Sequence, residues 1–257
     1  MGVSRSHLYA APRPRGIRER AGDTELVEKI RRVVRDKPTF GYRRVTAALR
    51  RSGVHVNHKR VYRLMKHHQL LLARYGPKPV RPHEGKVITL KSDLRWCSDG
   101  FEIRCWNGER VHVAFSLDCC DREAIAWVAA NRHLDGADIR DLMAESIERR
   151  FASIHTPHPI EWLSDNGPPY VSEATRSFGR DSGLLVCNTP AYSPESNGMA
   201  EAFVKTFKRD FVYLCDVANA DVVLQQLPSW FEEYNENHPH KGLKMLSPRE
   251  FRKARLA

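Results

Sequence analysis

Several features that would place the protein in a membrane or outside the cell are missing. The 257-residue sequence has no apolar run approaching the ~20 residues of a membrane-spanning helix. Its first 20 residues hold five arginines but no apolar segment of the kind that a secretory signal needs. The six cysteines form no Cys-x-x-Cys pair and no Cys/His ligand spacing, so we interpret them as reduced thiols rather than as a zinc site. These absences predict a cytoplasmic protein with no membrane partner.

Acidic residues are scarce in the first third of the chain. Residues 1 to 92 hold 23 Lys and Arg against 6 Asp and Glu, whereas residues 93 to 257 hold 19 against 25. A basic surplus confined to one part of a chain predicts a module that binds a polyanion, joined to a second unit. The length of the chain also suits one mid-sized core with a small appended domain.

Three short amphipathic helices are predicted in this basic part. Residues 24 to 35 repeat apolar side chains at helical spacing until Pro38 stops the pattern. The stretch "TFGYRRVTAALRRSG" predicts a second helix that Gly53 can cap, and Asn57 is expected to cap a third. Three short helices with a tight glycine-containing connection between the last two indicate a helix-turn-helix.

The basic side chains of these helices are candidate DNA-binding groups. Acidic residues that could pair with them along the helix are nearly absent from residues 41 to 67, which favours phosphate contact over a merely solvated helix face. The residues that we assign to DNA contact in this domain are Tyr42, Arg43, Arg44, Lys59, Arg60 and Arg63.

The remainder of the chain has the pattern of an α/β domain. Alternating apolar residues predict strands on both sides of Asn107-Gly108, which we expect to form a two-residue hairpin turn. Further along, the pattern predicts a third strand, a helix and a buried strand at residues 124–130, 137–151 and 159–163. A buried strand that follows a crossover helix is expected to pair in parallel.

Three acids stand at informative places in this domain. Asp165 directly follows the predicted strand 159–163, where ligand-binding groups collect, although a lone aspartate at such a place is most often a turn former. Asp99 lies within the first strand, where Asp is disfavoured unless its charge is compensated. Glu201 lies on a predicted helix opened by Asn197-Gly198 and shares one face with Lys205 and Lys208. The apolar residues that we expect on the buried face are Phe203, Phe207, Phe211 and Leu214.

Other acids are weaker candidates. Glu195 is the alternative third acid, but it falls in the loop before the helix that carries Glu201, so we interpret it as a surface residue. Asp118 and Asp121 flank the exit of the second strand, where terminating that strand is the simpler role, and they remain spare candidates.

The spacing of the three acids matches a known pattern. Asp99 and Asp165 are separated by 65 residues, and Asp165 and Glu201 by 35. This arrangement resembles the Asp, Asp, 35, Glu signature of retroviral integrases and insertion-sequence transposases. The stretches "RWCSDGFE", "EWLSDNGPPY", "SPESNGMAEAFVKTFKRD" and "YNENHPHKGLKMLSPREF" are similar to the second-frame (OrfB) product of two-frame bacterial insertion sequences. The resemblance extends from about residue 3 to residue 255, and the ordered series of motifs is highly specific.

The resemblance implies a fold and a domain order. The fold class would be α/β, an RNase H-like integrase catalytic core with a mixed five-stranded sheet and flanking helices, preceded by a small all-α helix-turn-helix domain. We expect a remnant of an upstream helix-turn-helix with a basic linker, a helix-turn-helix-like domain, a linker, the catalytic core and a C-terminal helical extension, at residues 1–21, 22–75, 76–92, 93–214 and 215–257. The extension ends in a basic helix for which packing on the core and DNA contact are both open.

The chemistry of three crowded carboxylates agrees with the implied activity. Like charges repel unless cations neutralise them, and Mg²⁺ or Mn²⁺ prefers such oxygen ligands. Two ions about 4 Å apart can serve an in-line phosphodiester displacement. We expect Asp99 to bridge both ions, with Asp165 and Glu201 each completing one side. Lys205 and Lys208 are then expected to hold the backbone of the scissile strand.

Similarity to OrfB products implies a transposase that recognises terminal inverted repeats, nicks DNA in a metal-dependent step and transfers the exposed 3′-hydroxyl to target DNA. The expected partners are these DNAs, further copies of the chain and the first-frame (OrfA) product. The alternatives are a catalytically silent DNA-binding regulator of transposition, a truncated transposase fragment, and an RNase H-like nuclease that hydrolyses without joining.

Overall fold

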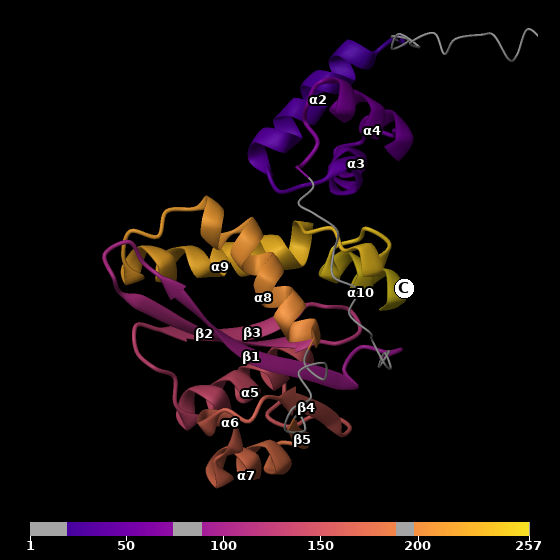
Figure 1. The fold of residues 1–257 in the computed structure, drawn as a ribbon. Coiled ribbons are helices and arrows are strands. Elements are labelled where there is room, and N and C mark those ends of the chain that lie inside the picture. The colour runs from indigo at the N-terminus through magenta and orange to yellow at the C-terminus, as the bar shows by residue number, and fades with distance from the viewer. Residues whose placement is uncertain (1–19, 74–88, 189–197, 257) are drawn as a thin grey trace, which may run out of the picture. The chain divides into compact units, whose positions relative to one another are not determined.

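The computed structural model describes residues 20–73, 89–188 and 198–256. The chain divides into two compact units, Met1–Arg74 and Tyr75–Ala257, which we describe separately (Figure 1). The predicted upstream remnant, most of the predicted linker, and the predictions for Glu195 and Asn197 lie outside the described residues. Within those described ranges, no helix is long and apolar enough to cross a membrane.

The first unit contains the three predicted helices, α2 (Asp23–Asp36), α3 (Tyr42–Arg51) and α4 (His58–His67). The side chain of Asn57 caps α4 by accepting a hydrogen bond from the backbone N–H of Lys59, as predicted. Gly53 follows α3 with φ +81°, a left-handed conformation that lets the chain turn at once toward α4. Apolar side chains from all three helices form one small core, in which Ile30, Val45 and Val61 are fully buried.

An ion-pair cluster joins the first and last of these helices. Asp23, at the start of α2, is buried and contacts the guanidinium groups of Arg60 at 2.7 Å and Arg63 at 2.6 Å. Burial alone would raise the pKa of the Asp23 carboxyl, but a backbone hydrogen bond from Arg20 and the two arginines outweigh it and lower the pKa. Two arginines that the sequence assigned to DNA therefore also hold the domain together, because their acidic partner comes from a distant helix.

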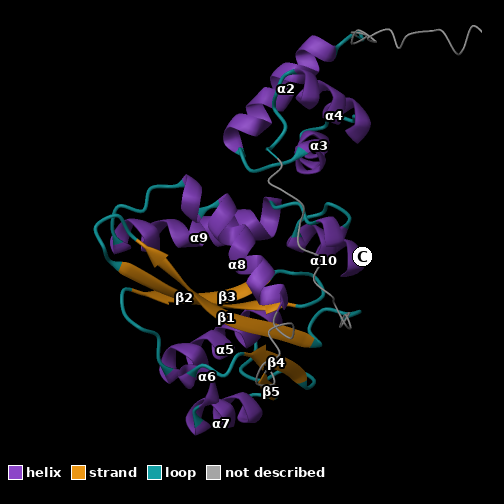
Figure 2. Ribbon diagram, viewed as in Figure 1, coloured by secondary structure: helices purple, strands orange, loops and turns teal. Residues whose placement is uncertain are grey.

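The second unit is built on a five-stranded sheet with the order β3-β2-β1-β4-β5 (Figure 2). The strands are β1 (Arg95–Arg104), β2 (Arg110–Asp118), β3 (Ala124–Ala130), β4 (Ile160–Ser164) and β5 (Leu184–Asn188). The first three pair antiparallel, whereas β4 is parallel to both β1 and β5, which confirms the predicted mixed sheet. Register pairs β4 only with Arg95, Trp96 and Cys97 of β1. The second half of β1 therefore runs on beyond its pairing with β4.

The hairpin between β1 and β2 differs from the predicted two-residue turn. Cys105 donates its N–H to the carbonyl of Glu109, and Gly108 donates back to the carbonyl of Cys105. Residues 105 to 109 connect the strands, and the three residues 106 to 108 form the turn between the hydrogen-bonded Cys105 and Glu109, with Gly108 in the left-handed region at φ +91°. The prediction was wrong because Asn-Gly also suits a three-residue loop in which only the glycine needs a positive φ.

Helices cover both faces of this sheet (Figure 1). On one face lies α5 (Gly136–Phe151), with α6 (Pro168–Val171) and α7 (Glu173–Asp181) beside it. On the other face lie α8 (Gly198–Asp210) and α9 (Ala220–Asn237), with the short helices η2 (Val212–Leu214) and η3 (Lys241–Leu243) and the terminal α10 (Pro248–Leu256). Each face has its own apolar core, because successive strand residues point to opposite sides.

The aromatic side of α8 is buried against β1, β2 and α9. Phe203 packs against Phe115 at 4.4 Å between ring centroids, and Phe207 contacts Phe231 at 4.6 Å. Phe211 is also buried, as the helical spacing predicted. Leu214 was predicted to share this face, but it lies in η2 and is exposed, because α8 ends at Asp210 and the helical phase is lost there.

The C-terminal helix α10 packs on the core. Arg249 forms ion pairs with Glu123 at 2.9 Å, Glu232 at 2.5 Å and Glu236 at 2.8 Å, and thereby links α10 to the β2–β3 connection and to α9. The charges of these partners raise the pKa of Arg249 against the opposing effect of burial. The question that the sequence left open is thus answered in favour of packing for this part of the extension.

A buried cluster of charges surrounds Arg150 at the end of α5. Its guanidinium group approaches Asp121 at 3.2 Å, and Asp93 and Glu123 at 3.4 Å each. Asp118 accepts hydrogen bonds from the backbone N–H groups of Asp93, Cys120 and Asp121 and ends β2. Both spare acids, Asp118 and Asp121, thus have structural partners in the β2–β3 connection.

Replacement of Arg150 by Met should strongly destabilise the second unit. The substitution would leave the buried Asp121 without the cation that pairs with it, while Glu123 keeps Arg249, and breaking a buried ion pair from one side costs about 3–5 kcal/mol. The matched control is Arg149→Met, whose exposed pair with Glu145 is worth less than about 1 kcal/mol. Urea unfolding followed by circular dichroism measures both variants. Equal stability of the two would contradict the role given to the cluster.

Candidate active site

Asp99 lies in the middle of β1, on the face covered by α8. It shares this face with Cys97 and Phe101, and its cross-strand neighbour on β2 is the buried Phe115. One carboxylate oxygen accepts a hydrogen bond of 2.8 Å from the N–H of Gly100. An acid is therefore held on an otherwise apolar strand surface, where water can solvate it only in part.

Asp165 lies immediately beyond the carboxyl end of β4, the strand that pairs in parallel with β1 beside Asp99. Its Oδ1 accepts the N–H of Gly167 at 3.0 Å, which sets the direction of the carboxylate at the start of α6. A Cβ atom on Gly167 would lie only 3.0 Å from the same oxygen. Position 167 therefore favours glycine because a side chain would crowd the Asp165 carboxylate, and not because the backbone is left-handed there.

Glu201 lies in the first turn of α8, on the side opposite the buried phenylalanines. Its carboxylate pairs with Lys205 one turn later, at 3.2 Å, and both side chains remain largely accessible to solvent. Lys208, a further turn on, lies over the ring of Phe101 at 5.6 Å from the ring centroid. The shared face of α8 that the sequence predicted is present, but Lys208 is half-buried and points toward the β1 surface beyond Asp99.

The three acids interact electrostatically. The pKa of Asp99 is raised to about 6, mainly by burial and to a smaller extent by the negative charges of Asp165 and Glu201, while the hydrogen bond from Gly100 opposes the rise. The structure thus brings a strand interior, a strand end and a helix start into one negatively charged space. Among residues 20–73, 89–188 and 198–256, no three His, Cys, Asp or Glu are gathered tightly enough to hold one metal ion.

A buried hydrogen bond beneath these acids was not anticipated from the sequence. Ser98 of β1 and Tyr170 of α6 join their hydroxyl groups at 3.0 Å, and both side chains are buried. Burial raises the pKa of the Tyr170 hydroxyl, so it stays protonated. Since Ser98 adjoins Asp99 and Tyr170 follows the Asp165 turn, this bond fixes the two acidic segments to each other. The only sequence signal was an aromatic residue five positions after Asp165.

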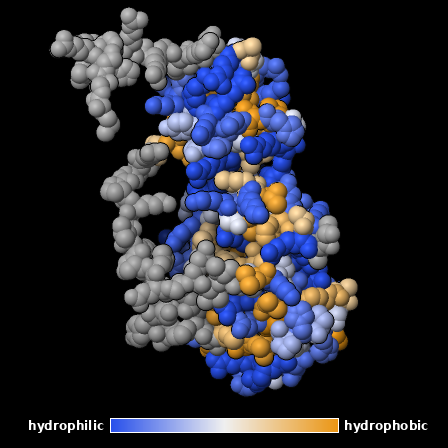
Figure 3. All heavy atoms as spheres, turned by 90° about the vertical axis from the view of Figure 1, so that its right-hand side faces the viewer, coloured by the Kyte–Doolittle hydropathy of each residue, from blue (hydrophilic) through white to orange (hydrophobic). Residues whose placement is uncertain are grey.

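The residues predicted to bind DNA in the first unit have different surroundings. Tyr42 packs edge-on against Tyr62 and accepts a hydrogen bond from Arg43, while the side chain of Lys59 is exposed in the first turn of α4. Arg44 lies over the ring of Phe40 at 5.5 Å from the ring centroid. On the face shown in Figure 3, the surface of this unit is mostly hydrophilic. Arg43 and Lys59 are exposed to solvent, whereas the guanidinium groups of Arg60 and Arg63 form ion pairs with Asp23.

The fold and the three acids define the class of integrase-type cores joined to a helix-turn-helix-like domain. The family described as HTH-like domain matches residues 21–78, and two families described as integrase core domain match residues 90–194 and 183–248. Among solved structures, the simian T-cell lymphotropic virus intasome in complex with PP2A regulatory subunit B56 gamma has a chain with a TM-score of 0.54 and 14% identity, covering 87% of this chain and 73% of that one. The HTLV-2 integrase catalytic core domain in complex with magnesium gives a TM-score of 0.50 at 12% identity, covering 63% and 97%.

Curated relatives are closer in sequence. Transposase InsD for insertion element IS2A/D/F/H/I/K of Escherichia coli is 45% identical over 240 residues, which cover 91% of this chain and 80% of the relative. Transposase InsD for insertion element IS2-9 of Escherichia coli strain K12 is also 45% identical, covering 91% and 78%. The chain belongs to the family of these insertion-sequence transposases, as the motifs of the sequence indicated.

Replacement of Asp99 by Asn should stabilise the protein at neutral and alkaline pH in the absence of divalent cations. The folded-state pKa of Asp99, about 6, lies above the ordinary value of 3.8, so ionisation costs folding stability as the pH rises from about 4 to about 6. Asn carries no charge at any pH. We expect the variant to exceed the wild type by about 1–3 kcal/mol at pH 8 and to match it near pH 4.

Urea titrations in EDTA at both pH values measure this difference. Asp141→Asn, on the exposed side of α5, is the control and should change stability little at either pH. A stability gain for Asp99→Asn that is equal at pH 4 and pH 8, or no gain at pH 8, would contradict the cost assigned to ionising Asp99 in its half-buried place.

Proposed function

We propose that Asp99, Asp165 and Glu201 are the catalytic acids with which this transposase-family chain cuts and joins DNA. The observation that carries the proposal is the electrostatic coupling of the three carboxylates, each from a different element of the sheet–helix core. Such a group is unstable when fully ionised and alone. Cations bound between the three carboxylates during the reaction would remove this repulsion.

The donor set fits Mg²⁺ or Mn²⁺, because these cations favour carboxylate oxygens and need no sulfur or imidazole ligand. When bound, two such ions would activate water or a 3′-hydroxyl and stabilise the departing oxygen. Asp99 interacts electrostatically with both Asp165 and Glu201, so it would be the acid shared by both ions. Asp165, oriented by Gly167, and Glu201, on the first turn of α8, would each complete one side.

Substrate placement falls to the basic residues around these acids. Lys205 pairs with Glu201 in the absence of DNA. If cations neutralised Glu201, the ammonium group of Lys205 would be released and could contact a phosphate. In the first unit, Lys59 and Arg43 would contact the phosphates of the element ends through the helix-turn-helix. Expected partners are terminal inverted repeats, target DNA, further copies of the chain and the first-frame product of the element.

Single replacements of the three acids should abolish strand cleavage and joining while DNA binding persists. Asp99→Asn, Asp165→Asn and Glu201→Gln remove one ligand charge each with little change in volume, and we expect at least a hundredfold loss of joined product, since each acid serves the transition state. The assay follows labelled DNA carrying the element's own ends with Mg²⁺ or Mn²⁺, both for this chain and for its fusion to the first-frame product.

Glu195→Gln is the matched control and should retain activity, because Glu195 is the alternative third acid in the sequence. Loss of activity in Glu195→Gln with retention in Glu201→Gln would reassign the third acid. Hydrolysis without joined products would favour the nuclease alternative. End binding without cleavage by any protein would favour the regulator.

Replacement of Lys59 by Ala should weaken binding to duplex DNA and reduce its salt dependence. Removal of one phosphate contact lowers the slope of log affinity against log salt by about 1. Lys29→Ala, in the neighbouring helix, is the control because the Lys29 ammonium pairs with Glu25 at 2.5 Å and lies outside the predicted interface. Fluorescence anisotropy between 50 and 300 mM salt measures both. A slope unchanged by Lys59→Ala would remove this residue from the interface.

A further inference from the structure

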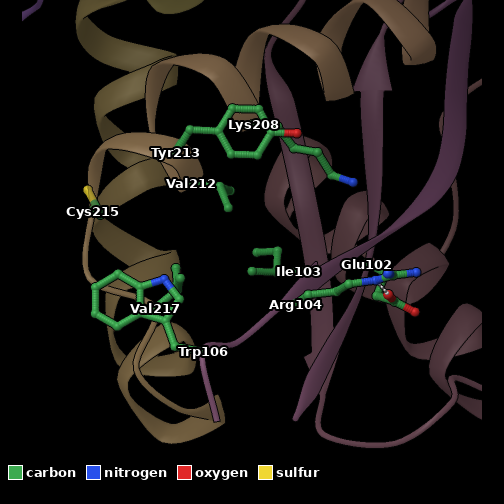
Figure 4. Close-up of a pocket in the computed structure, with 9 residues that line it drawn as sticks. All are labelled: Glu102, Ile103, Arg104, Trp106, Lys208, Val212, Tyr213, Cys215 and Val217. Atoms are coloured by element: carbon green, nitrogen blue, oxygen red, sulfur yellow. Dashed lines mark hydrogen bonds and ion pairs between the residues drawn. The ribbon is translucent and has the colours of Figure 1, made fainter. Parts of the chain in front are cut away.

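A hollow of about 770 Å³ opens beside the second half of β1, between the β1–β2 turn and the connection from α8 to α9 (Figure 4). Its apolar lining includes Ile103, Val212 and Val217, and its size lies within the range of sites that take small organic groups. The backbone N–H of Trp106 donates to the carbonyl of Val217 at 2.9 Å, so the turn and the connection are fixed to each other. The hollow is therefore a defined feature of the core.

Two large aromatic side chains line this hollow from different segments. Trp106 comes from the β1–β2 turn and is 73% exposed, while Tyr213 comes from η2 and is 72% exposed. In Figure 4 the two rings lie at separate points around the space that Val212 borders. Exposed aromatic rings at a concave surface mark binding sites, because their faces can be covered by a planar partner.

The charge around the hollow is positive. Arg104 contacts Glu102 at 2.7 Å and Arg110 contacts the same carboxylate at 3.2 Å, so two guanidinium groups share one acid. Arg110 lies outside the lining, so Lys208 is the second cation of the lining after Arg104; burial lowers the pKa of Lys208. Aromatic rings between basic groups suit a ligand with flat rings and a negative backbone, which is the chemistry of a nucleic-acid strand.

The hollow lies further along α8 than Glu201, because Lys208 of the same helix is part of its lining. Glu201 and Lys208 are seven residues apart on this helix, which corresponds to about 10 Å along its axis. This distance equals about three steps of a stacked DNA strand at about 3.4 Å each. A strand whose scissile phosphate lies at Glu201 would thus reach the hollow within a few nucleotides.

We infer that this hollow binds one or two unpaired bases of the DNA strand held at the active site, by stacking on Trp106 and Tyr213, while Lys208 and Arg104 contact the adjoining phosphates. The bases of an intact duplex are stacked inside it and cannot cover these rings, so the site selects DNA that is single-stranded close to the point of reaction. The inference rests on the proposed function, since it takes the strand at the three acids as the ligand.

The test measures binding of the full-length chain to a 12-nucleotide oligothymidine, to a strand of the same length without bases, and to a 12-base-pair duplex. Trp106→Ala and Tyr213→Ala should each weaken oligothymidine binding about five- to hundredfold, because stacking of each base contributes that much. Their affinity for the baseless strand and the duplex should stay within twofold of the wild type. Trp106→Phe and Tyr213→Phe should restore most of the oligothymidine affinity. Ile154→Ala, which truncates an exposed apolar side chain outside the hollow, is the control.

Three results would overturn the inference. The alanine variants could leave oligothymidine binding unchanged, or weaken the baseless strand and the duplex equally, in which case the rings do not recognise bases. They could instead change only the oligomeric state in sedimentation, which would make the hollow a contact between copies of the chain. These assays need no cleavage, so any of these results together with normal joining activity would leave the proposed function intact. Variants of the three acids that are inactive but bind oligothymidine normally would support both the proposed function and the inference.

Discussion

The partial burial of a carboxylate, Asp99, beside two further carboxylates is the constraint on which the account of the second unit depends. Asp99 is half-buried on an apolar strand surface, and this burial, with a smaller contribution from the charges of Asp165 and Glu201, raises its pKa to about 6. A protein that only needed stability would place a neutral residue there. The fold tolerates this unfavourable charge because the surrounding structure is held by other means, and under the proposed function the same charge would attract the cations that serve a phosphodiester.

Those other means lie close to the acids and use both packing and polar contacts. The phenylalanines of α8 fix the helix that carries Glu201 onto β1 and β2. The bond between Ser98 and Tyr170 ties the Asp165 turn to the strand of Asp99. The Arg150 cluster neutralises a second group of buried acids at the opposite end of α5, where charge has a structural and not a catalytic role. The two acidic clusters thus differ in role. The buried cluster is neutralised within the fold by Arg150, whereas Asp99, Asp165 and Glu201 are proposed to bind cations from solution.

Much of this arrangement could be predicted from the sequence, because local patterns determine it. Strand alternation, the Asn57 cap and the crossover before β4 predicted the helices of the first unit, strands β1 to β4 and helix α5, whereas the five-stranded mixed sheet was implied by the family resemblance; strand ends predicted where Asp165 would lie. Contacts between distant segments could not be predicted in this way. The pairing of Asp23 with Arg60 and Arg63, the bond from Ser98 to Tyr170, and the hollow formed by Trp106 and Tyr213 each join residues whose proximity depends on the whole fold. Leu214 shows the related limit, since a helical pattern does not reveal where the helix stops.

Calorimetric titration of Mn²⁺ into the full-length chain at pH 7.5 tests the central claim most directly, that the three carboxylates bind divalent cations together. The account predicts saturable binding to the wild type that is at least tenfold weaker after Asp165→Asn or Glu201→Gln, and unchanged after Asp141→Asn, because removal of any one ligand charge weakens the shared site. Mn²⁺ binding of equal strength in the wild type and in both variants of the candidate acids would contradict the account.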